Sequence, residues 1–463
     1  MVEAVSTLPT PAGAHRVVDL ALRTGELLLA GGASAAEVTA TCGAVARAGG
    51  LRRVECDITF TSITVTGQAA DVDGAPVSGL RLVQSRELDY SKVSAVHAVV
   101  SDLVEGRITP SEADHRLTRI VAARHRYQRL TVTAARATLA AAVALLLGAG
   151  PVVTAAAFGA TVLVDLTIVA LGRQGLPAFF LNAAGGLVAT AVALVLVAVD
   201  VGVRPSLVVA GGIVLLLPGV TLVGAVHDAI TGFYVTASAR AFETFLLTAG
   251  ILSGIAIALS LGGRLGVPVT IWDPPTTGLG DIPLQLLAAA AASTSFAVSN
   301  YAPLRTLPVA GGSGALGWAV VVGLDRLELS ATLASATAAI VIGAGSYVVA
   351  LYQRVPAMVY VAAGIIPLLP GLTIYRALRR LSSGDTAGGI ALLGTAITIG
   401  LALAAGALFG EYLAQALRRT KNPLERRLSG LMQARAARRG DRPLRVAAEA
   451  APGSPGRRRR GLV

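Results

Sequence analysis

Between residues 131 and 411 the sequence is an almost unbroken series of apolar blocks. Each block is near the roughly 20 residues that a helix needs to cross a hydrocarbon core of about 30 Å. In lipid every backbone polar group must be bonded within the protein, so only helices and closed barrels span membranes. The blocks are runs of Ala, Leu and Val, unlike the alternating segments of about ten residues that form barrel strands. With 54% hydrophobic and 14% charged residues in the whole chain, the sequence predicts a helical protein that crosses the membrane several times.

Ten apolar blocks follow one another, bounded by glycine, proline and charged residues, and each predicts one transmembrane helix. The predicted spans are 131–149, 152–172, 177–199, 206–226, 238–262, 282–302, 306–323, 331–352, 357–378 and 387–411. Basic residues gather before the first span and after the last, so an even number of spans puts both ends in the cytoplasm. The cluster Arg376, Arg379 and Arg380 is an exception, because this count places it on the outer side.

The sequence before the first span predicts a small cytoplasmic α+β domain at residues 15–130, after a disordered stretch at residues 1–14. Ser34 and Glu37 have the spacing of a capping box at the start of a helix. Residues 54–61 alternate between apolar and polar side chains, which is the period of a strand. Early charged residues interrupt any apolar core of a signal peptide, so we expect this domain to stay in the cytoplasm.

The predicted domain carries no motif for catalysis. It has no nucleophile–base spacing, no phosphate-binding Gly-Lys-Ser/Thr loop and no metal-ligand set. Its two cysteines, Cys42 and Cys56, give neither a disulfide framework nor a metal quartet. We therefore predict no catalytic residues, no metal and no cofactor, and we interpret the domain as a regulatory, gating or assembly element.

The net charge of +12 comes mostly from the predicted C-terminal tail, residues 412–463. From residue 418 onward the tail has 14 basic and three acidic residues. Basic segments beside a membrane bind anionic lipid head groups with about 1 kcal/mol per residue. Nucleic-acid binding is not expected, because no stacking aromatic residues accompany the basic run. We expect a cytoplasmic tail held near anionic lipids, and formation of a homo-oligomer stays open.

One segment of the sequence is repeated. Residues 213–221 align without a gap with residues 365–373, and both copies contain Leu-Pro-Gly at an offset of 152 residues. The repeat divides the membrane region into two halves of five spans, residues 131–262 and 282–411, joined by an extracytoplasmic loop at residues 263–281. Because five is odd, the second half would cross the membrane in the opposite direction. Inverted repeats of this kind recur in secondary transporters, where the substrate site lies at the interface of the repeats.

The repeated motif has the chemistry of a broken helix. Proline lacks an N–H and clashes with the previous helical turn, and the glycine after it permits further unwinding. The freed backbone groups bind a ligand only where they line a cavity and not lipid; the alternative is that both motifs are packing kinks. The candidate substrate-pathway residues of the motif are Pro218, Gly219, Thr221, Pro370, Gly371 and Thr373.

Ionisable residues in the membrane region are candidates for function, because a charge at a helix centre costs about 2.5–3.5 kcal/mol to insert. Asp165 lies in the middle of a span, where it is either a proton carrier or a structural partner of a residue elsewhere. Asp228, Arg240 and Glu243 border a short polar loop after the fourth span. They form either a cytoplasmic gate or substrate clamp, or a plain surface salt bridge. His227 is a further candidate because imidazole titrates near neutral pH.

Three stretches resemble the threonine/serine exporter family of bacterial inner-membrane transporters. They are residues 27–38 (Leu-Leu-Leu-Ala-Gly-Gly-Ala-Ser-Ala-Ala-Glu-Val), residues 57–65, and residues 217–222 with the residues that follow as far as Glu243. The resemblance covers nearly the whole chain except its first residues and the basic tail. It implies a cytoplasmic N-terminal domain, ten helices, and export of small hydroxy amino acids driven by the proton motive force. The candidate His227 rests on its chemistry and not on the resemblance.

The expected protein is thus mainly α-helical, with about ten transmembrane helices in two five-helix inverted repeats after a small α+β domain. Its expected function is secondary transport, in which threonine, serine or similar small amino acids leave the cell in exchange for protons. We expect it in the bacterial inner membrane, with both termini in the cytoplasm, and we expect no enzyme activity. The alternatives are a membrane-anchored enzyme or regulator that acts through the N-terminal domain, and a passive channel for small solutes.

Overall fold

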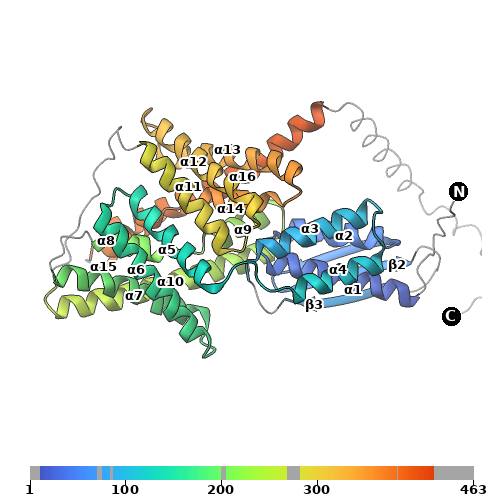
Figure 1. Cartoon of the computed structure of the whole chain (residues 1–463), viewed down its shortest axis with the longest axis horizontal. Coiled ribbons are helices and arrows are strands. Elements are labelled where there is room, and N and C mark those ends of the chain that lie inside the picture. Colours follow the sequence, from blue (N-terminus) through green and yellow to red (C-terminus); the bar gives the residue numbers. More distant parts are fainter. Residues whose placement is uncertain are drawn as a thin grey trace, which may run out of the picture. The chain divides into compact units, whose positions relative to one another are not determined.

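The computed structural model describes residues 11–69, 76–83, 87–199, 205–267, 282–382 and 384–421 (Figure 1). The chain divides into two compact units, residues 1–412 and 413–463. Most of the expected loop at 263–281 and most of the basic tail lie outside the described residues. Because Pro11–Ala30 is helical, the prediction of disorder for residues 1–14 is wrong from residue 11 onward.

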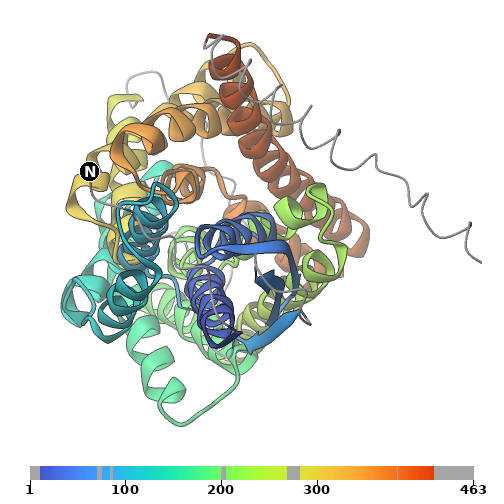
Figure 2. The same ribbon diagram turned by 90° about the vertical axis from the view of Figure 1, so that its right-hand side faces the viewer.

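Four helices and a three-stranded antiparallel sheet form the N-terminal part of the first unit. The elements are α1 (Pro11–Ala30), α2 (Ala35–Ala48), β1 (Leu51–Thr59), β2 (Ser62–Ala69), β3 (Val77–Leu82), α3 (Tyr90–Val104) and α4 (Pro110–Ala122). The strands follow the order β1-β2-β3, and α1 packs along β2 and β3 (Figure 2). Leu28, Val38, Ile63 and Leu117 are almost fully buried in a core that these elements share. The predicted cap is present, since Ser34 Oγ accepts a hydrogen bond from the Glu37 N–H at 3.2 Å.

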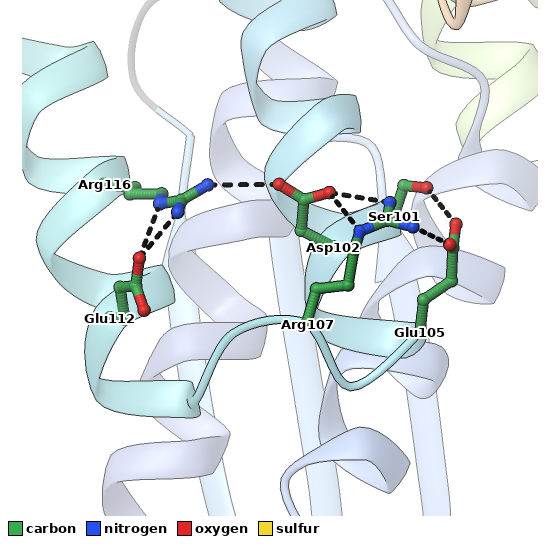
Figure 3. A network of polar contacts seen from close by, with 6 residues as sticks. All are labelled: Ser101, Asp102, Glu105, Arg107, Glu112 and Arg116. Atoms are coloured by element: carbon green, nitrogen blue, oxygen red, sulfur yellow. Dashed lines mark hydrogen bonds and ion pairs between the residues drawn. The ribbon is translucent and has the colours of Figure 1, made fainter.

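Ion pairs and hydrogen bonds join the end of α3 to α4 (Figure 3). Arg116 donates to Asp102 at 3.1 Å and to Glu112 at 2.6 Å, and Arg107 donates to both Asp102 and Glu105. The hydrogen bond from Arg107 is the main reason that the pKa of Asp102 lies below its usual value. These side chains are open to solvent, where ion pairs contribute about 0–1 kcal/mol each. The network therefore orients the α3–α4 turn and adds little to stability.

Eight helices are long and apolar enough to cross a membrane, counted over the described residues. They are α5 (Arg129–Leu146), α6 (Pro151–Gly172), α7 (Ala178–Ala198), α10 (Tyr234–Arg264), α11 (Ile282–Ser299), α12 (Leu307–Asp325, preceded by the short turn η2 at Leu304–Thr306), α13 (Ala331–Gln353) and α16 (Thr386–Lys421). Each matches one predicted span, so the class of polytopic helical membrane protein is confirmed. Helix α10 begins four residues before its predicted start at residue 238, and α16 runs ten residues past its predicted end at residue 411.

The fourth and ninth predicted spans are each broken into short helices. The first is divided into α8 (Pro205–Ile213) and α9 (Gly219–Ile230), and the second into α14 (Ala357–Ile365), the turn η3 (Ile366–Leu368) and α15 (Gly371–Ser382). Both breaks fall at Leu-Pro-Gly, as expected where proline removes a helical hydrogen bond. Within the predicted span 357–378, the apolar stretch ends at Leu368, just before the break. The three residues Arg376, Arg379 and Arg380 belong to the separate helix α15. They therefore lie outside the apolar stretch that ends at Leu368.

Glycines bring two pairs of long helices into backbone contact. A Cβ atom on Gly254 of α10 would lie 1.9 Å from the Ala183 carbonyl oxygen of α7. A Cβ atom on Gly406 of α16 would lie 2.6 Å from the Ala336 carbonyl oxygen of α13. Small residues at such positions let membrane helices approach closely and pack by van der Waals contact. Gly254 and Gly406 are 152 residues apart, which is the offset of the two Leu-Pro-Gly motifs.

A matched pair of substitutions on α10 tests this packing. Gly254→Ala should destabilise the protein by about 1–3 kcal/mol, because the added methyl group overpacks a tight contact. Gly263→Ala is the control, because a Cβ atom there meets nothing within 4 Å and alanine favours a helix by about 1 kcal/mol over glycine. Thermal unfolding of the purified protein in detergent measures both changes. Equal melting temperatures for the two variants would contradict the contact.

Candidate functional site

The two Leu-Pro-Gly breaks lie against each other. A Cβ atom on Gly219 would lie 2.5 Å from Leu369 Cδ1, and one on Gly371 would lie 3.1 Å from Leu217 Cδ1. Each break is therefore covered by the leucine that precedes the proline of the other. Backbone that leaves the helical pattern at membrane depth is tolerated where protein buries it, and this arrangement provides that cover.

A cavity of about 200 Å³ adjoins the first break. Its lining residues come from that break, from α5, from the end of α11 and from the segment before α3. They are Leu88, Arg136, Leu215, Leu217, Pro218, Val220, Thr221, Phe296, Ser299 and Asn300. Pro218 and Thr221 are thus the predicted residues that line the cavity, whereas Pro370, Gly371 and Thr373 belong to the break that packs beside it.

The embedded acid Asp165 on α6 is bound by two residues of α5. Thr133 Oγ1 donates a hydrogen bond to Asp165 Oδ2 at 2.6 Å, and Arg136 Nη1 pairs with Asp165 Oδ1. The Asp165 residue is 1% exposed, so the guanidinium supplies the opposite charge that a buried carboxylate needs. Asp165 is among the site residues predicted from the sequence, whereas Arg136 is not. A cation inside the predicted span 131–149 was itself a signal, because such residues are functional candidates by default.

Asp228 and Arg240 form a buried ion pair that holds the backbone between α1 and α2. Arg240 Nε lies 3.3 Å from Asp228 Oδ2. Asp228 Oδ1 accepts a hydrogen bond from the Ala35 N–H at 2.8 Å, and Arg240 Nη2 donates to the Ala33 carbonyl oxygen at 3.0 Å. The carboxylate meets the first turn of α2, where helix N–H groups favour negative charge. We name this group, Ala33, Ala35, Asp228 and Arg240, the loop clamp.

The other two predicted residues near the loop clamp are half-buried. His227 precedes Asp228 on α9, and Glu243 lies one helical turn beyond Arg240 on α10. Thr236, at the start of α10, accepts a hydrogen bond from the Phe60 N–H at 3.1 Å and donates to the Ile58 carbonyl oxygen at 3.2 Å. The loop clamp and Thr236 therefore join the N-terminal elements to α9 and α10.

A second set of contacts joins the N-terminal part to the end of α11. The Tyr90 N–H donates to the Asn300 carbonyl oxygen at 2.9 Å, and the Tyr127 hydroxyl donates to the Ala302 carbonyl oxygen at 2.7 Å. The His125 ring stacks on Tyr301 with centroids 4.5 Å apart. Because Leu88 also lines the cavity, N-terminal residues form part of its wall.

An acidic side chain of α2 titrates near neutral pH. Burial raises the pKa of Glu37 to about 7. The folded state holds the Glu37 proton more tightly than the unfolded chain does. Its contribution to stability is therefore present at acidic pH and is lost as the pH rises through about 7.

Comparisons with known proteins agree on one family. Residues 19–262 match a family model described as "Putative threonine/serine exporter", and residues 285–413 match one described as "Threonine/Serine exporter, ThrE". A probable threonine/serine exporter of Mycobacterium tuberculosis is 36% identical over 411 residues, covering 87% of this chain and 77% of that protein. A threonine/serine exporter of Corynebacterium glutamicum is 33% identical over 408 residues, covering 87% of this chain and 83% of that protein. No solved structure matches the chain.

Together, the two family models cover the N-terminal elements and both halves of the membrane region. The family names indicate a transporter and not an enzyme. The eight apolar helices agree with a multi-pass membrane protein. The chain belongs to the threonine/serine exporter family.

Proposed function

We propose that this chain exports threonine, serine or similar small amino acids from the cytoplasm by proton antiport across the bacterial inner membrane. The observation that carries the proposal is the meeting of two broken helices beside a small cavity that both apolar and polar residues line. Secondary transporters place their substrate sites at such points, where interrupted helices turn backbone groups toward a ligand. Both termini lie in the cytoplasm in this proposal, and the tail remains near anionic lipids.

Two inverted repeats of five helices account for the paired features. In this proposal α8–α9 and α14–α15 are corresponding broken spans, so the chain crosses the membrane ten times. The shared offset of 152 residues supports the repeat, because it relates the proline pair and also the glycine pair Gly254 and Gly406. The glycine contacts join the third and fifth spans of each half, α7 with α10 and α13 with α16.

Asp165 is the proton carrier in this proposal. A carboxyl group whose charge is balanced by a neighbouring guanidinium changes the net charge of the pair when it binds a proton. That change alters the cost of burying the pair, and so biases one arrangement of the helices over the other. The pairing with Arg136 is compatible with this role and with the structural alternative, so the two must be separated by experiment.

Asp165→Asn tests the role in coupling. We expect the variant to insert normally and to lose the pH dependence of transport. Asparagine has nearly the size of aspartate and still forms hydrogen bonds, but it carries no titratable proton. Threonine efflux from loaded vesicles, with and without a pH gradient, measures the effect. Asp325→Asn, an exposed residue at the end of α12, is the control. Efflux that still responds fully to the gradient in Asp165→Asn would leave Asp165 as a structural partner only.

The N-terminal elements act as a cytoplasmic gate in this proposal. The loop clamp and the contacts of Tyr90 and Tyr127 tie them to the ends of α9, α10 and α11, and Leu88 reaches the cavity wall. Release of the loop clamp would uncover that wall. In this gate, the buried ion pair of the loop clamp holds backbone atoms at the start of α2.

Asp228→Ala tests whether the loop clamp holds the gate. The Ala35 amide loses its acceptor, so hydrogen–deuterium exchange in a peptide spanning residues 31–38 should speed up by about tenfold or more, equivalent to roughly 1.4 kcal/mol. Exchange in residues 110–122 of α4 should stay unchanged and serves as the internal control. Equal exchange of residues 31–38 in the variant and the wild type would show that other contacts hold this segment.

A further inference from the structure

We infer that the cavity beside Pro218 binds the α-carboxylate of a free amino acid, with Arg136 as its carboxylate-binding residue. This inference rests on the proposed function, since it names the substrate site of the same transporter. The site includes Arg136 from α5, the first turn of α9, and Ser299 and Asn300 at the end of α11.

Arg136 has donor capacity beyond its ion pair. Its Nη1 binds Asp165, whereas its Nε is buried and has no hydrogen-bond partner within the part of the chain that the structure describes. A buried donor without a partner costs about 1–3 kcal/mol. The planar guanidinium presents its N–H groups in a fork that matches a carboxylate. A ligand carboxylate therefore satisfies a donor that the protein leaves open.

The start of α9 supplies a second feature that favours an anion. Helix α9 begins at Gly219, and no side chain caps its N-terminus. Val220 and Thr221 of its first turn line the same cavity as Arg136. The N–H groups of a first helical turn carry partial positive charge and bind anions. The Arg136 guanidinium and the N-terminus of α9 thus both attract an anion into the same cavity.

The end of α11, which also lines the cavity, offers oxygen atoms for an ammonium group. Asn300 Nδ2 donates to the Phe296 carbonyl oxygen at 2.8 Å, which leaves the side-chain oxygen of Asn300 as an acceptor. Ser299 Oγ donates to the same carbonyl at 2.8 Å and accepts a hydrogen bond from Asn300 Nδ2 at 3.3 Å. One of the two lone pairs of this hydroxyl oxygen therefore remains as an acceptor. Because an amino acid is a zwitterion, it adds no net charge to the Arg136–Asp165 pair, and no uncompensated charge is buried.

The size of the cavity limits the ligand. Its volume of about 200 Å³ is below the roughly 300–1,000 Å³ of pockets that hold drug-sized molecules. Leu215, Leu217, Val220 and Phe296 give it apolar walls, which suit a short side chain with a methyl group. The cavity has room for a single small amino acid.

Competition in proteoliposomes tests the site with full-length protein. Radiolabelled threonine counterflow is measured with unlabelled threonine or threoninamide as competitor, because threoninamide keeps the ammonium and hydroxyl groups but has no carboxylate. Wild-type protein should prefer threonine to threoninamide by about tenfold or more, the factor expected for one charge-assisted hydrogen bond. In Arg136→Gln this preference should disappear. Arg129→Gln, an exposed residue at the start of the same helix, should keep the wild-type preference.

A measurement on wild-type protein covers the case in which Arg136→Gln does not fold. An arginine-selective dicarbonyl reagent labels Arg136, and mass spectrometry should show that threonine slows this labelling while threoninamide does not. Unchanged labelling, or a wild-type preference retained in Arg136→Gln, would overturn the site while leaving export intact. Absence of any threonine counterflow in wild-type protein would instead overturn the proposed function.

Discussion

The structure depends on how two interrupted helices are buried. Proline at 218 and at 370 ends a helix within the apolar region, and each interruption frees backbone groups that lipid cannot satisfy. The two breaks solve this problem together, because Leu369 covers Gly219 and Leu217 covers Gly371. One buried core joins the surrounding elements, with Leu139 of α5, Phe296 of α11 and Tyr360 of α14 among its members. A site with exposed backbone groups can form there because the neighbouring helices exclude lipid.

Two ion pairs join helices of the membrane region. Asp165 meets Arg136 between α5 and α6, and Asp228 meets Arg240 between α9 and α10. The first pair adjoins the cavity, since Arg136 lines it. The second pair holds the backbone at the start of α2. In our account the first pair binds substrate and protons, and the second controls access from the cytoplasm.

Local chemistry allowed much of the fold to be predicted from the sequence. Proline in the interior of a helix interrupts it, and Ser34 accepts a hydrogen bond from the N–H group three positions later. Both features could therefore be predicted without knowing the packing. The partners of the charged residues could not be predicted in this way. Ala35 is 193 residues from Asp228, and Ala33 is 207 residues from Arg240. Arg136 is 29 residues from Asp165, and their contact depends on how α5 packs against α6. The predicted span 357–378 includes part of the polar helix α15, although the sequence already indicated a broken helix at Pro370.

Cross-linking in bacterial membranes tests the central claim, that the two breaks face each other inside the protein. Leu217→Cys and Leu369→Cys are combined in a chain whose native Cys42 and Cys56 are replaced by serine. A short bifunctional thiol reagent should join the two introduced cysteines within one chain, and added threonine should slow the reaction. If the cysteines do not cross-link and instead react freely with a lipid-soluble maleimide, the breaks face lipid and the account is wrong.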